Sequence, residues 1–333
     1  MGPGLGGGFG RFSGYYGLVL DSIIELDVVL ANGSIITVSE SSHSDLFWGM
    51  RGAGHNFGIV TRFSYKIYDI PHPDWFFSTM TFTNDKLEAV FEALNTFGAN
   101  GTQPKEAVTY TLYTLNPEIS ATEPVVIFVL QFGASAVEAA PILAPFFALK
   151  PLSATNETVP YTGAAHAAGA GVTDATCLPG VSAQLYPVGL QTYNISTNRA
   201  IYNLYKTMVN ENPGLNTSIV QFEGYAQQGI RAVDPDSTAY AHRGDSLLVS
   251  YGPIWSPSEP SLAAVASDYG HQARTTFHAG EPGRTLNTYV NYASSDETPE
   301  MLYGYEPWRL ERLRKLKSEY DPKGKFNFYN PIR

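Results

Sequence analysis

Two runs of alternating apolar and polar residues near the start of the chain predict a β-hairpin. They lie in residues 22–40, SIIELDVVLANGSIITVSE, where "ANG" separates them. Alternation with a period of two is typical of strands that are buried on one face only. Asn32 and Gly33 suit the tight turn between the two strands, because both residue types tolerate positive φ angles.

A short helical pattern follows the hairpin, and alternation then resumes. Residues 42–60, SHSDLFWGMRGAGHNFGIV, predict a helix capped near Ser44 and stopped at Gly52, followed by a glycine-rich loop. Residues 59–71 alternate again and predict a strand that ends at a proline. We therefore expect residues 1–71 to form one unit: a glycine loop, a hairpin, a helix, a second loop and a strand.

The region 72–280 has a different order of patterns. Apolar, β-branched runs predict strands, and longer runs with apolar residues every three or four positions predict helices. This order predicts an α+β domain with a mainly antiparallel sheet and helices on one side. The predicted strands lie within 75–83, 107–115, 124–132, 217–233 and 245–255, and the predicted helices within 84–98, 135–149, 197–209 and 260–277.

The last segment, 281–333, predicts a strand, a long helix and an end terminated by proline. The sequence YVNY places Tyr289 and Asn291 on one face of the predicted strand. The helix contains the run RLERLRKLK, whose Arg and Lys residues resemble a basic patch. Because the chain as a whole is acidic, we expect these Arg and Lys side chains to form a solvated helix face.

Composition narrows the classes of partner. The 333 residues carry a formal net charge of −10, and an acidic surface repels nucleic acid. No apolar run reaches the 18–20 or so residues that a membrane-spanning helix needs. The single cysteine, Cys177, is expected to be a buried structural thiol, because a lone cysteine usually behaves as a small apolar residue.

Five N-x-S/T sequons, at Asn32, Asn100, Asn156, Asn194 and Asn216, favour an exported glycoprotein. The first residues nevertheless lack the basic and apolar regions of a signal peptide. Because the chain has several sequons but no signal peptide at its first residues, we expect further sequence upstream of Met1. We accordingly expect a secreted or extracellular location for the full-length protein.

Two glycine loops flank the predicted hairpin and are candidates for binding a ligand. Glycines at positions 6, 7, 8 and 10 have no Cβ, so backbone N–H groups there can approach an anion closely. A Rossmann loop is followed by a helix, whereas a hairpin follows here, so that mode of dinucleotide binding is disfavoured. The motifs HExxH and GxSxG and an EF-hand loop are absent from the sequence, and we expect no metal site.

Several motifs together resemble the FAD-linked oxidases of the berberine-bridge-enzyme-like family, in its fungal branch. They are GPGLGGGFGRFSGYYGLVLDSI, DLFWGMRGAGHNFGIVTRF, TAYAHRGDSLLVSY, YVNYASSDE, YGYEPWRLERLRKLKSEYDP and FNFYNPI, and they occur in the family's order. The resemblance implies the second half of a PCMH-type FAD-binding domain in 1–71 and a substrate-binding domain in 72–280. It also implies that 281–333 is the berberine-like segment that returns to the FAD domain.

The resemblance further implies which residues bind FAD. Gly6, Gly7, Gly8 and Gly10 would lie along the pyrophosphate or flavin edge. The second loop would hold the adenine and diphosphate end, and residues near the C-terminus would approach the isoalloxazine ring. The residues implied for the adenine and diphosphate end are Gly54, Asn56, Gly58, Ile59 and Val60. Those implied for the isoalloxazine ring are Asn291, Tyr292 and Asn330.

Members of the family pass a hydride from an alcohol, sugar or amine carbon to the flavin, which molecular oxygen then usually reoxidises. The protein must orient a small-molecule substrate and accept a proton. Tyr292 and Glu223 are the candidate proton acceptors, although Glu223 could equally be a paired surface carboxylate. For His55 and His242 we favour structural hydrogen bonds over catalysis.

The chain departs from the family in one respect. The resemblance implies upstream residues that carry a flavin-linked histidine and a cysteine, and no residue of this chain replaces them. We therefore expect a truncated chain that retains FAD weakly and that could be inactive. The alternatives are a flavin-free remnant that only binds a ligand, a non-redox cyclase of the same family, and a secreted structural glycoprotein.

Overall fold

The computed structural model describes residues 2–98, 101–171 and 180–333. These residues cluster into two compact units, each described below by itself. The first combines Met1–Asp69, Gln227–Asp245 and Thr285–Arg333, and the second combines Ile70–Ala226 and Ser246–Arg284. The two ends of the chain thus belong to the same unit.

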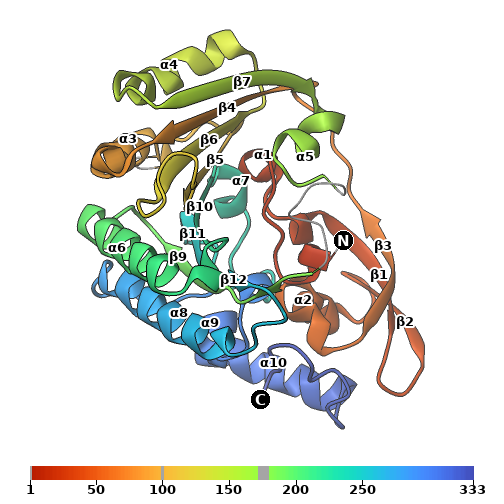
Figure 1. Ribbon diagram of the computed structural model, residues 1–333. Coiled ribbons are helices and arrows are strands. Elements are labelled where there is room, and N and C mark those ends of the chain that lie inside the picture. The colour runs from red at the N-terminus through yellow and green to blue at the C-terminus, as the bar shows by residue number, and fades with distance from the viewer. Residues whose placement is uncertain (1, 99–100, 172–179) are drawn as a thin grey trace. The chain divides into compact units, whose positions relative to one another are not determined.

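The first unit contains the predicted hairpin and third strand. β1 (Ile23–Val29) pairs antiparallel with β2 (Ile35–Ser39) and β3 (Ile59–Tyr65), in the order β2-β1-β3 (Figure 1). At the turn, Gly33 has φ +86°, and the Asn32 side chain accepts a hydrogen bond from the Ser34 N–H. The hairpin is therefore confirmed, with the glycine supplying the positive φ and the asparagine a side-chain turn contact.

Short helices surround this sheet. The first unit contains α1 (Ser13–Tyr16), α2 (Ser44–Ala53), α7 (Gln228–Arg231), α9 (Pro299–Tyr303) and α10 (Pro307–Tyr320), with the 3₁₀ turns η1 (Gly2–Leu5), η2 (Val19–Ser22), η3 (Gly54–Asn56) and η9 (Val290–Tyr292). The strand predicted for YVNY is wrong, because η9 occupies these residues and the Tyr292 N–H bonds the Tyr289 carbonyl. Four residues of alternating character do not distinguish a strand from a single tight turn.

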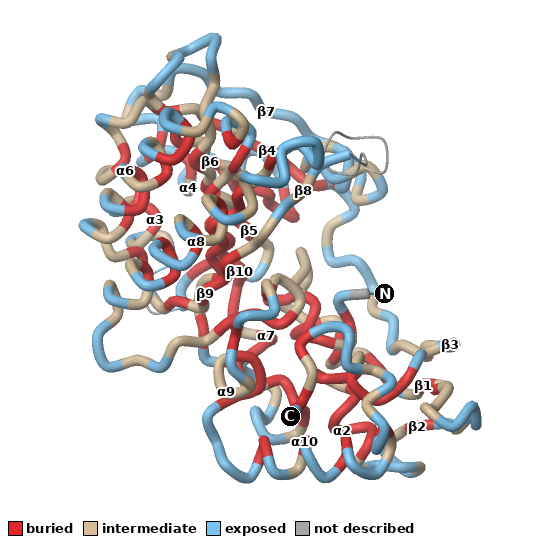
Figure 2. Tube along the Cα trace, turned by 60° about the horizontal axis from the view of Figure 1, so that its bottom comes forward, coloured by how far each residue is buried: buried red, intermediate tan, exposed pale blue. Residues whose placement is uncertain are grey.

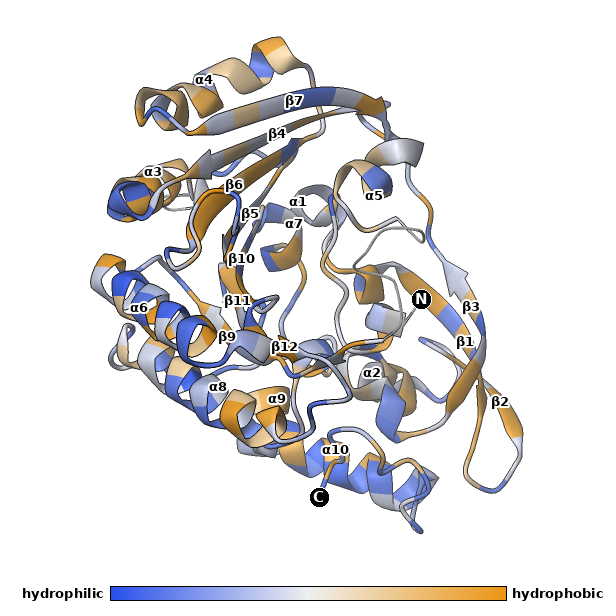
Figure 3. Ribbon diagram, in the orientation of Figure 1, coloured by the Kyte–Doolittle hydropathy of each residue, from blue (hydrophilic) through white to orange (hydrophobic). Residues whose placement is uncertain are grey.

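Helix α10 is hydrophilic along most of its length, as Figure 3 shows. The expectation that its basic residues all face solvent is nevertheless wrong for two of them. Arg309 is fully buried, and Lys317 is buried where it donates to the Asp321 carboxylate and the Asn56 carbonyl. A buried cation is stable only when its donors are paired, and both of these side chains have such partners.

The second unit is built on a seven-stranded antiparallel sheet in the order β7-β4-β6-β5-β10-β11-β9. Its mainly antiparallel character was predicted, but β7 and β9 were not. β7 was missed because its sequence, SATNETVP, is mostly polar and lacks an apolar run. The strands are β4 (Asp74–Phe82), β5 (Ala107–Thr114), β6 (Val125–Phe132), β7 (Ser153–Pro160), β9 (Tyr186–Leu190), β10 (Ile219–Tyr225) and β11 (Leu247–Gly252), beside a small sheet of β8 (Ser182–Ala183) and β12 (Ile254–Trp255).

Helices pack on one face of the seven-stranded sheet, as predicted (Figure 1). Phe222 of β10 contacts Phe91 and Phe277, and Phe128 of β6 stacks on Phe146 with ring centroids 4.0 Å apart. Those three partners come from α3, α8 and α4. The unit's helices are α3 (Leu87–Gly98), α4 (Ala136–Ala148), α5 (Ala164–Ala167), α6 (Ile195–Glu211) and α8 (Leu262–Ala279), with the 3₁₀ turns η4 (Asn84–Lys86), η6 (Tyr161–Gly163) and η8 (Pro213–Leu215).

Three further sequence-based expectations concern the single cysteine, membrane-spanning helices and metal binding. Cys177 lies outside the described residues, so its predicted role as a buried thiol remains untested. Among the described residues, no helix has the length and apolar character to cross a bilayer. The same residues contain no group of three or more His, Cys, Asp or Glu side chains placed to hold a metal ion.

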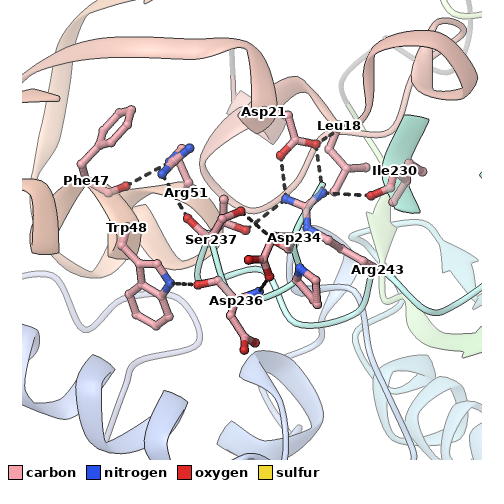
Figure 4. Close-up of polar contacts among 12 residues, drawn as sticks. Leu18, Asp21, Phe47, Trp48, Arg51, Ile230, Asp234, Asp236, Ser237 and Arg243 are labelled. Atoms are coloured by element: carbon pink, nitrogen blue, oxygen red, sulfur yellow. Dashed lines mark hydrogen bonds and ion pairs between the residues drawn. The ribbon is translucent and has the colours of Figure 1, made fainter. Parts of the chain in front are cut away.

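Residues 227–245 group with the first unit, although segments of the second unit precede and follow them in the sequence. The reason is a buried ion pair (Figure 4). Both terminal nitrogens of Arg243 donate to the Asp21 carboxylate, at 3.0 and 2.6 Å. The two side chains are only 3% and 6% exposed, and Arg243 also donates to the Ile230 carbonyl and the Thr238 hydroxyl.

Helix α2 holds the same segment through its backbone and side chains. The Trp48 indole donates to the Asp236 carbonyl, and Arg51 donates to the Ser237 carbonyl (Figure 4). The helix is kinked at Arg51 and Gly52; Gly52 has a φ of +136°, and a Cβ on it would lie 2.3 Å from the Tyr240 backbone nitrogen. Only glycine permits this close approach. The position of 227–245 thus depends on contacts that the sequence pattern does not reveal.

We expect the substitution Asp21→Asn to destabilise the first unit strongly, because it leaves Arg243 buried without its counter-ion. Breaking a buried pair from one side typically costs about 3–5 kcal/mol. Urea unfolding followed by tryptophan fluorescence measures this loss. Asp27→Asn is the matched control, because Asp27 pairs with the exposed side chain of Arg62. Equal losses for the two variants would contradict the role of Asp21 as an anchor.

A pair of glycine substitutions tests the contact between α2 and residues 227–245. Gly33 and Gly52 both have positive φ, but only Gly52 lies against another backbone. Gly33→Ala should therefore cost only backbone strain, about 1–2 kcal/mol. Gly52→Ala should cost clearly more, because the 227–245 segment must also shift. Thermal unfolding of the two variants compares them directly, and a smaller loss at Gly52 would count against the proposed packing.

Candidate cofactor site

The first glycine loop is shaped by close packing against two other segments of the first unit. A Cβ on Gly6 would lie 2.2 Å from the Asn291 side-chain oxygen, and one on Gly7 would lie 2.9 Å from the Tyr289 ring. A Cβ on Gly8 would lie 2.5 Å from Val19. Gly7 and Gly8 also have φ angles of +138° and +92°. Glycine is therefore required here by the protein's own packing and backbone conformation.

Most of the N–H groups expected to face an anion are bonded within the protein. The Gly8 N–H donates to the Tyr289 hydroxyl at 2.9 Å, and the Gly6 and Gly10 N–H groups donate to the Pro3 carbonyl and the Ser13 hydroxyl. The carbonyls of Gly7 and Gly8 accept from Leu20 and Val19. The proposed mode of binding through a row of free N–H groups is thus not supported for these three glycines. A ligand would meet a fixed glycine surface.

The first loop touches the second. A Cβ on Gly54 would lie 3.0 Å from the Leu5 side chain, and one on Gly58 would lie 2.7 Å from the Val29 carbonyl oxygen. Ile59 and Val60 follow on β3, where they pair with Val29 and Val28, and Ile59 is 60% exposed. The structure therefore brings the two predicted loops into contact and leaves Ile59 on the surface of the sheet.

Asn56, at the end of η3, connects the second loop to the C-terminal segment. It is fully buried, and its side-chain oxygen accepts from the Ile332 N–H at 3.0 Å. Its Nδ2 donates to the Tyr303 hydroxyl at 3.0 Å, and its carbonyl accepts from Lys317. The Asn56 side chain therefore serves the fold, and the prediction that it holds the cofactor directly remains untested.

His55 lies beside Asn56 in a buried hydrogen-bond network. Its Nε2 is 3.1 Å from the Tyr303 hydroxyl, which in turn donates to the Asn330 carbonyl at 2.6 Å. Burial lowers the pKa of His55 to about 4, so its imidazole is neutral at pH 7. Burial also raises the pKa of Tyr303. His242 is buried as well and bonds the Leu302 carbonyl, so the structural role favoured for both histidines agrees with their contacts.

Asn330 is the predicted site residue whose surroundings depart most from an ordinary folded interior. Its side chain is 3% exposed, yet neither amide atom has a hydrogen-bond partner within the described part of the chain. Burial raises the pKa of the neighbouring Tyr329 hydroxyl to about 12, and the Asn330 side chain acts against this by lowering it. Asn330 also has a positive φ of +39°. Buried amides without partners are rare and point to a group that supplies them.

The C-terminal segment brings Asn330 to the first loop through one chain of contacts. The Tyr329 hydroxyl donates to the Val290 carbonyl at 2.5 Å and to the Ala293 carbonyl at 3.2 Å. The neighbouring Asn291 donates to the Pro3 carbonyl and the Tyr289 hydroxyl. Most of the predicted cofactor residues therefore form one continuous cluster in the first unit.

This cluster meets the requirements of a flavin nucleotide in two respects. At Gly10 no atom of the described residues lies within 4 Å of the position that a Cβ would take, so a flat group can approach the first loop there. Asn330 offers both a hydrogen-bond donor and an acceptor, which matches the alternating acceptors and donors on the polar edge of a flavin ring. The residues present are therefore compatible with FAD.

Glu223 lies in the second unit, on β10. It is 1% exposed, so the alternative of a paired surface carboxylate is excluded. Its carboxylate accepts from the Tyr225 hydroxyl at 2.5 Å and from the Gln221 amide at 2.8 Å. Tyr110 stands directly opposite Glu223 on β5, and its hydroxyl lies 3.1 Å from that of Tyr225.

Side-chain alternation places Glu223 on the sheet face opposite the helices. Phe222, its neighbour in sequence, points to the helix-covered face, and successive residues of a strand point to opposite faces. Gln221, Tyr225 and Tyr110 share the face of Glu223 by register. On β10 and β5 this face therefore presents the Glu223 carboxylate among hydroxyl and amide groups.

Sequence reasoning missed three residues that position the site. Tyr289 and Tyr303 link the glycine loops to the C-terminal segment, and Lys317 joins α10 to Asn56. The YVNY motif was a signal for Tyr289, but nothing marked Tyr303 or Lys317. Tyr292 is half-buried, and its ring centroid lies 5.2 Å from that of Tyr289 in an edge-to-face arrangement. Its proposed role as a proton acceptor is untested.

Comparison with known proteins places these observations in a family. Residues 288–333 match the family model described as "Berberine and berberine like". The chain is 46% identical over 333 residues to the FAD-linked oxidoreductase anuG of Penicillium roqueforti, covering 100% of this chain and 65% of that protein. It is 43% identical over 338 residues to the FAD-linked oxidoreductase iacH of Pestalotiopsis fici, covering 99% and 64%. The chain thus spans slightly less than two thirds of the length of these curated relatives.

Solved structures show the same fold. A chitooligosaccharide oxidase aligns with a TM-score of 0.79 at 22% identity, covering 100% of this chain and 70% of that one. A xylooligosaccharide oxidase from Myceliophthora thermophila, solved with xylobiose, aligns with a TM-score of 0.79 at 24% identity and the same coverage. The family model covers the segment that contains Asn291 and Asn330, and the sequence relatives cover the whole chain. The C-terminal segment thus matches the berberine-like family model, and over its whole length the chain is similar to fungal FAD-linked oxidoreductases.

Proposed function

We propose that the protein of which this chain forms part binds FAD and oxidises a small molecule, passing electrons to molecular oxygen. The buried, unpartnered amide of Asn330 carries the proposal, because it lies in the family's C-terminal segment and is linked through Tyr329 and Asn291 to the glycine surface. An amide left unpaired in a folded interior costs about 1–3 kcal/mol. A bound ring with a polar edge would offset that cost.

The residues of the first unit would hold the cofactor by shape more than by charge. The first loop is fixed by its own hydrogen bonds before any ligand arrives, so binding needs little ordering of the backbone. Neutral His55 and the Tyr303 hydroxyl keep the Asn330 backbone in place. Asn330 would then orient one edge of the ring, and Asn291 would stand beside Gly6.

Bound FAD would supply the hydride acceptor, which no amino-acid side chain can provide. The chain's own contribution is to orient the substrate and accept the proton of the group being oxidised. Glu223 suits this proton transfer, because a buried carboxylate flanked by hydroxyl and amide donors is held in one orientation. Tyr225 and Tyr110 extend its hydrogen bonds toward a substrate hydroxyl on the same sheet face. Tyr292 remains the second candidate acceptor.

The substrate class is proposed as alcohols, sugars or secondary-metabolite carbons bearing a hydroxyl group. The oligosaccharide oxidases with this fold and the fungal FAD-linked relatives support a small polar substrate. The polar face around Glu223 supports the same class, since hydroxyl and amide groups recognise substrate hydroxyls through directional hydrogen bonds. A secreted location of the full-length protein is part of this proposal.

Substitution of Asn330 tests cofactor binding. Asn330→Gly keeps the positive φ but removes the amide, so FAD affinity should fall about 10-fold, equivalent to roughly 1.4 kcal/mol. Stability without FAD should be unchanged or slightly higher, because an unpaired buried amide is lost. Fluorescence titration and thermal unfolding with and without FAD measure the two effects, using a chain extended by the part of the Penicillium roqueforti relative that lies outside the matched region.

Asn56→Ala is the control for this experiment. Its amide is fully used within the protein, so this variant should lose stability both with and without FAD. Unchanged FAD affinity in Asn330→Gly would remove the observation on which the proposal rests. A colourless extended protein that never takes up FAD would favour the flavin-free alternative.

Substitution of Glu223 tests proton transfer. Glu223→Gln preserves the shape of the side chain but removes the base, so the rate of flavin reduction should fall by about 10²–10⁴-fold while FAD binding stays constant. Anaerobic stopped-flow bleaching of the flavin measures this rate, after hydrogen peroxide release from a panel of oligosaccharides and alcohols has identified a substrate. Glu157→Gln, on exposed β7, is the matched control. A change of less than about threefold at Glu223 would assign it a structural role.

A further inference from the structure

The five sequons differ sharply in their structural settings. Asn32, Asn156 and Asn216 are exposed, Asn194 is half-buried, and Asn100 lies outside the described residues. Asn194 caps α6, where its oxygen accepts from the Thr197 N–H and its nitrogen donates to the Gly280 carbonyl. In the Asn216 sequon, Ser218 is fully buried. Neither of these two asparagines offers a free sequon in the folded chain.

Asn156 and Thr158 offer the opposite setting. Both residues are exposed on β7, and neither side chain makes a polar contact within the described part of the chain. The Asn156-Glu157-Thr158 sequon is extended and regular, because it pairs residue by residue with β4. Its amide and hydroxyl are therefore both accessible, whereas the Asn32 amide is engaged by the Ser34 N–H and hydroxyl.

Asn156 occupies the middle of a free sheet edge. β7 is the outermost strand of the seven-stranded sheet, and its residues 153–158 are all exposed (Figure 2). The pairing of β7 with β4 runs over eight residue pairs without a bulge. The opposite edge strand, β9, differs, because it is five residues long and mostly buried, and Tyr186 on it packs against Gly270 and Arg274 of α8.

A long, regular and exposed edge strand invites pairing with another chain. Proteins usually prevent this with lysines, bulges, prolines or a covering segment. β7 contains no lysine, one glutamate and a single proline at its last position. Within the described residues β7 thus has little protection, and a bulky hydrophilic group at its centre would provide it.

We propose that Asn156 carries an N-linked glycan that covers the free edge of β7. The inference is independent of the proposed oxidase activity, and it requires that the chain enter the secretory pathway. In the reaction, the Asn156 amide nitrogen loses a proton and forms a bond to the anomeric carbon of a lipid-linked oligosaccharide diphosphate. The lipid diphosphate leaves as that carbon–oxygen bond breaks, and no atom changes oxidation state.

Translation of the full chain, fused behind a secretory leader, in the presence of endoplasmic-reticulum microsomes tests acceptance of the glycan. Asn156→Gln and Thr158→Ala should each remove one glycosidase-sensitive step of the gel shift, and Thr158→Ser should keep it. The readout does not depend on folding, because transfer occurs on the nascent chain. An unchanged number of glycans in Asn156→Gln and Thr158→Ala would overturn the proposal.

The protective role of the glycan has its own test. In chains secreted from a eukaryotic host, Asn156→Gln should raise the oligomeric fraction several-fold in size-exclusion chromatography with light scattering. Asn32→Gln is the matched control, because it alters an exposed sequon away from β7. Equal oligomeric fractions for the parent and Asn156→Gln would overturn the protective role. A stable dimer of the parent chain with Asn156 unmodified would instead assign the edge to a second copy, and would also overturn it.

Discussion

The buried pairing of Asp21 with Arg243 is the constraint on which the first unit depends. It joins residues 222 positions apart in the sequence, inside a unit assembled from three separate segments. An unpaired guanidinium in this interior would be costly, so the segment that carries Arg243 is placed where the carboxylate is. Backbone contacts from α2 then fix the remaining residues of that segment, with Gly52 allowing the closest approach.

The C-terminal segment completes the unit by the same kind of contact. Asn56 receives hydrogen bonds from Lys317 and Ile332 and gives one to Tyr303, so three separate parts of the segment meet at one residue of the second glycine loop. Tyr289 makes the corresponding contact with the first loop through the Gly8 N–H. The glycine loops are thus held by the polar groups that follow them by some 250 residues in the chain. Asn330, at the end of this arrangement, has an amide without a hydrogen-bond partner among the residues that the structure describes.

The sequence predicts the regular elements well and the long-range polar contacts poorly. The hairpin at Asn32-Gly33 and the helix-covered antiparallel sheet follow from local turn chemistry and from apolar periodicity, which are properties of neighbouring residues. β7 was missed because a strand can be paired without being buried, and YVNY was misread because four residues support more than one backbone conformation. The burial of Arg309 and Lys317 depends on partners far away in the chain, and so does the grouping of residues 227–245 with the first unit. No local pattern encodes such partners.

The candidate site, too, could be predicted from the sequence only in part. The resemblance of motifs selected glycines and asparagines that the structure gathers into one cluster, but it did not separate those that serve packing from those that face a ligand. Gly58 and Asn56 are fully explained by contacts within the protein, whereas Asn330 is not. Glu223 was recognised as a carboxylate in a strand, and only its register and burial place it among tyrosines on the helix-free face.

The segmented composition of the two units has a consequence for synthesis on the ribosome. The second unit is complete in sequence once Arg284 has been made, whereas the first needs residues up to Ile332 before Asn56 acquires its last partner. During translation, the apolar side chains of the hairpin and the glycine loops therefore remain uncovered until the rest of the chain has emerged. The second unit can therefore assemble before the first is complete, although residues 1–69 of the first unit precede it in the sequence.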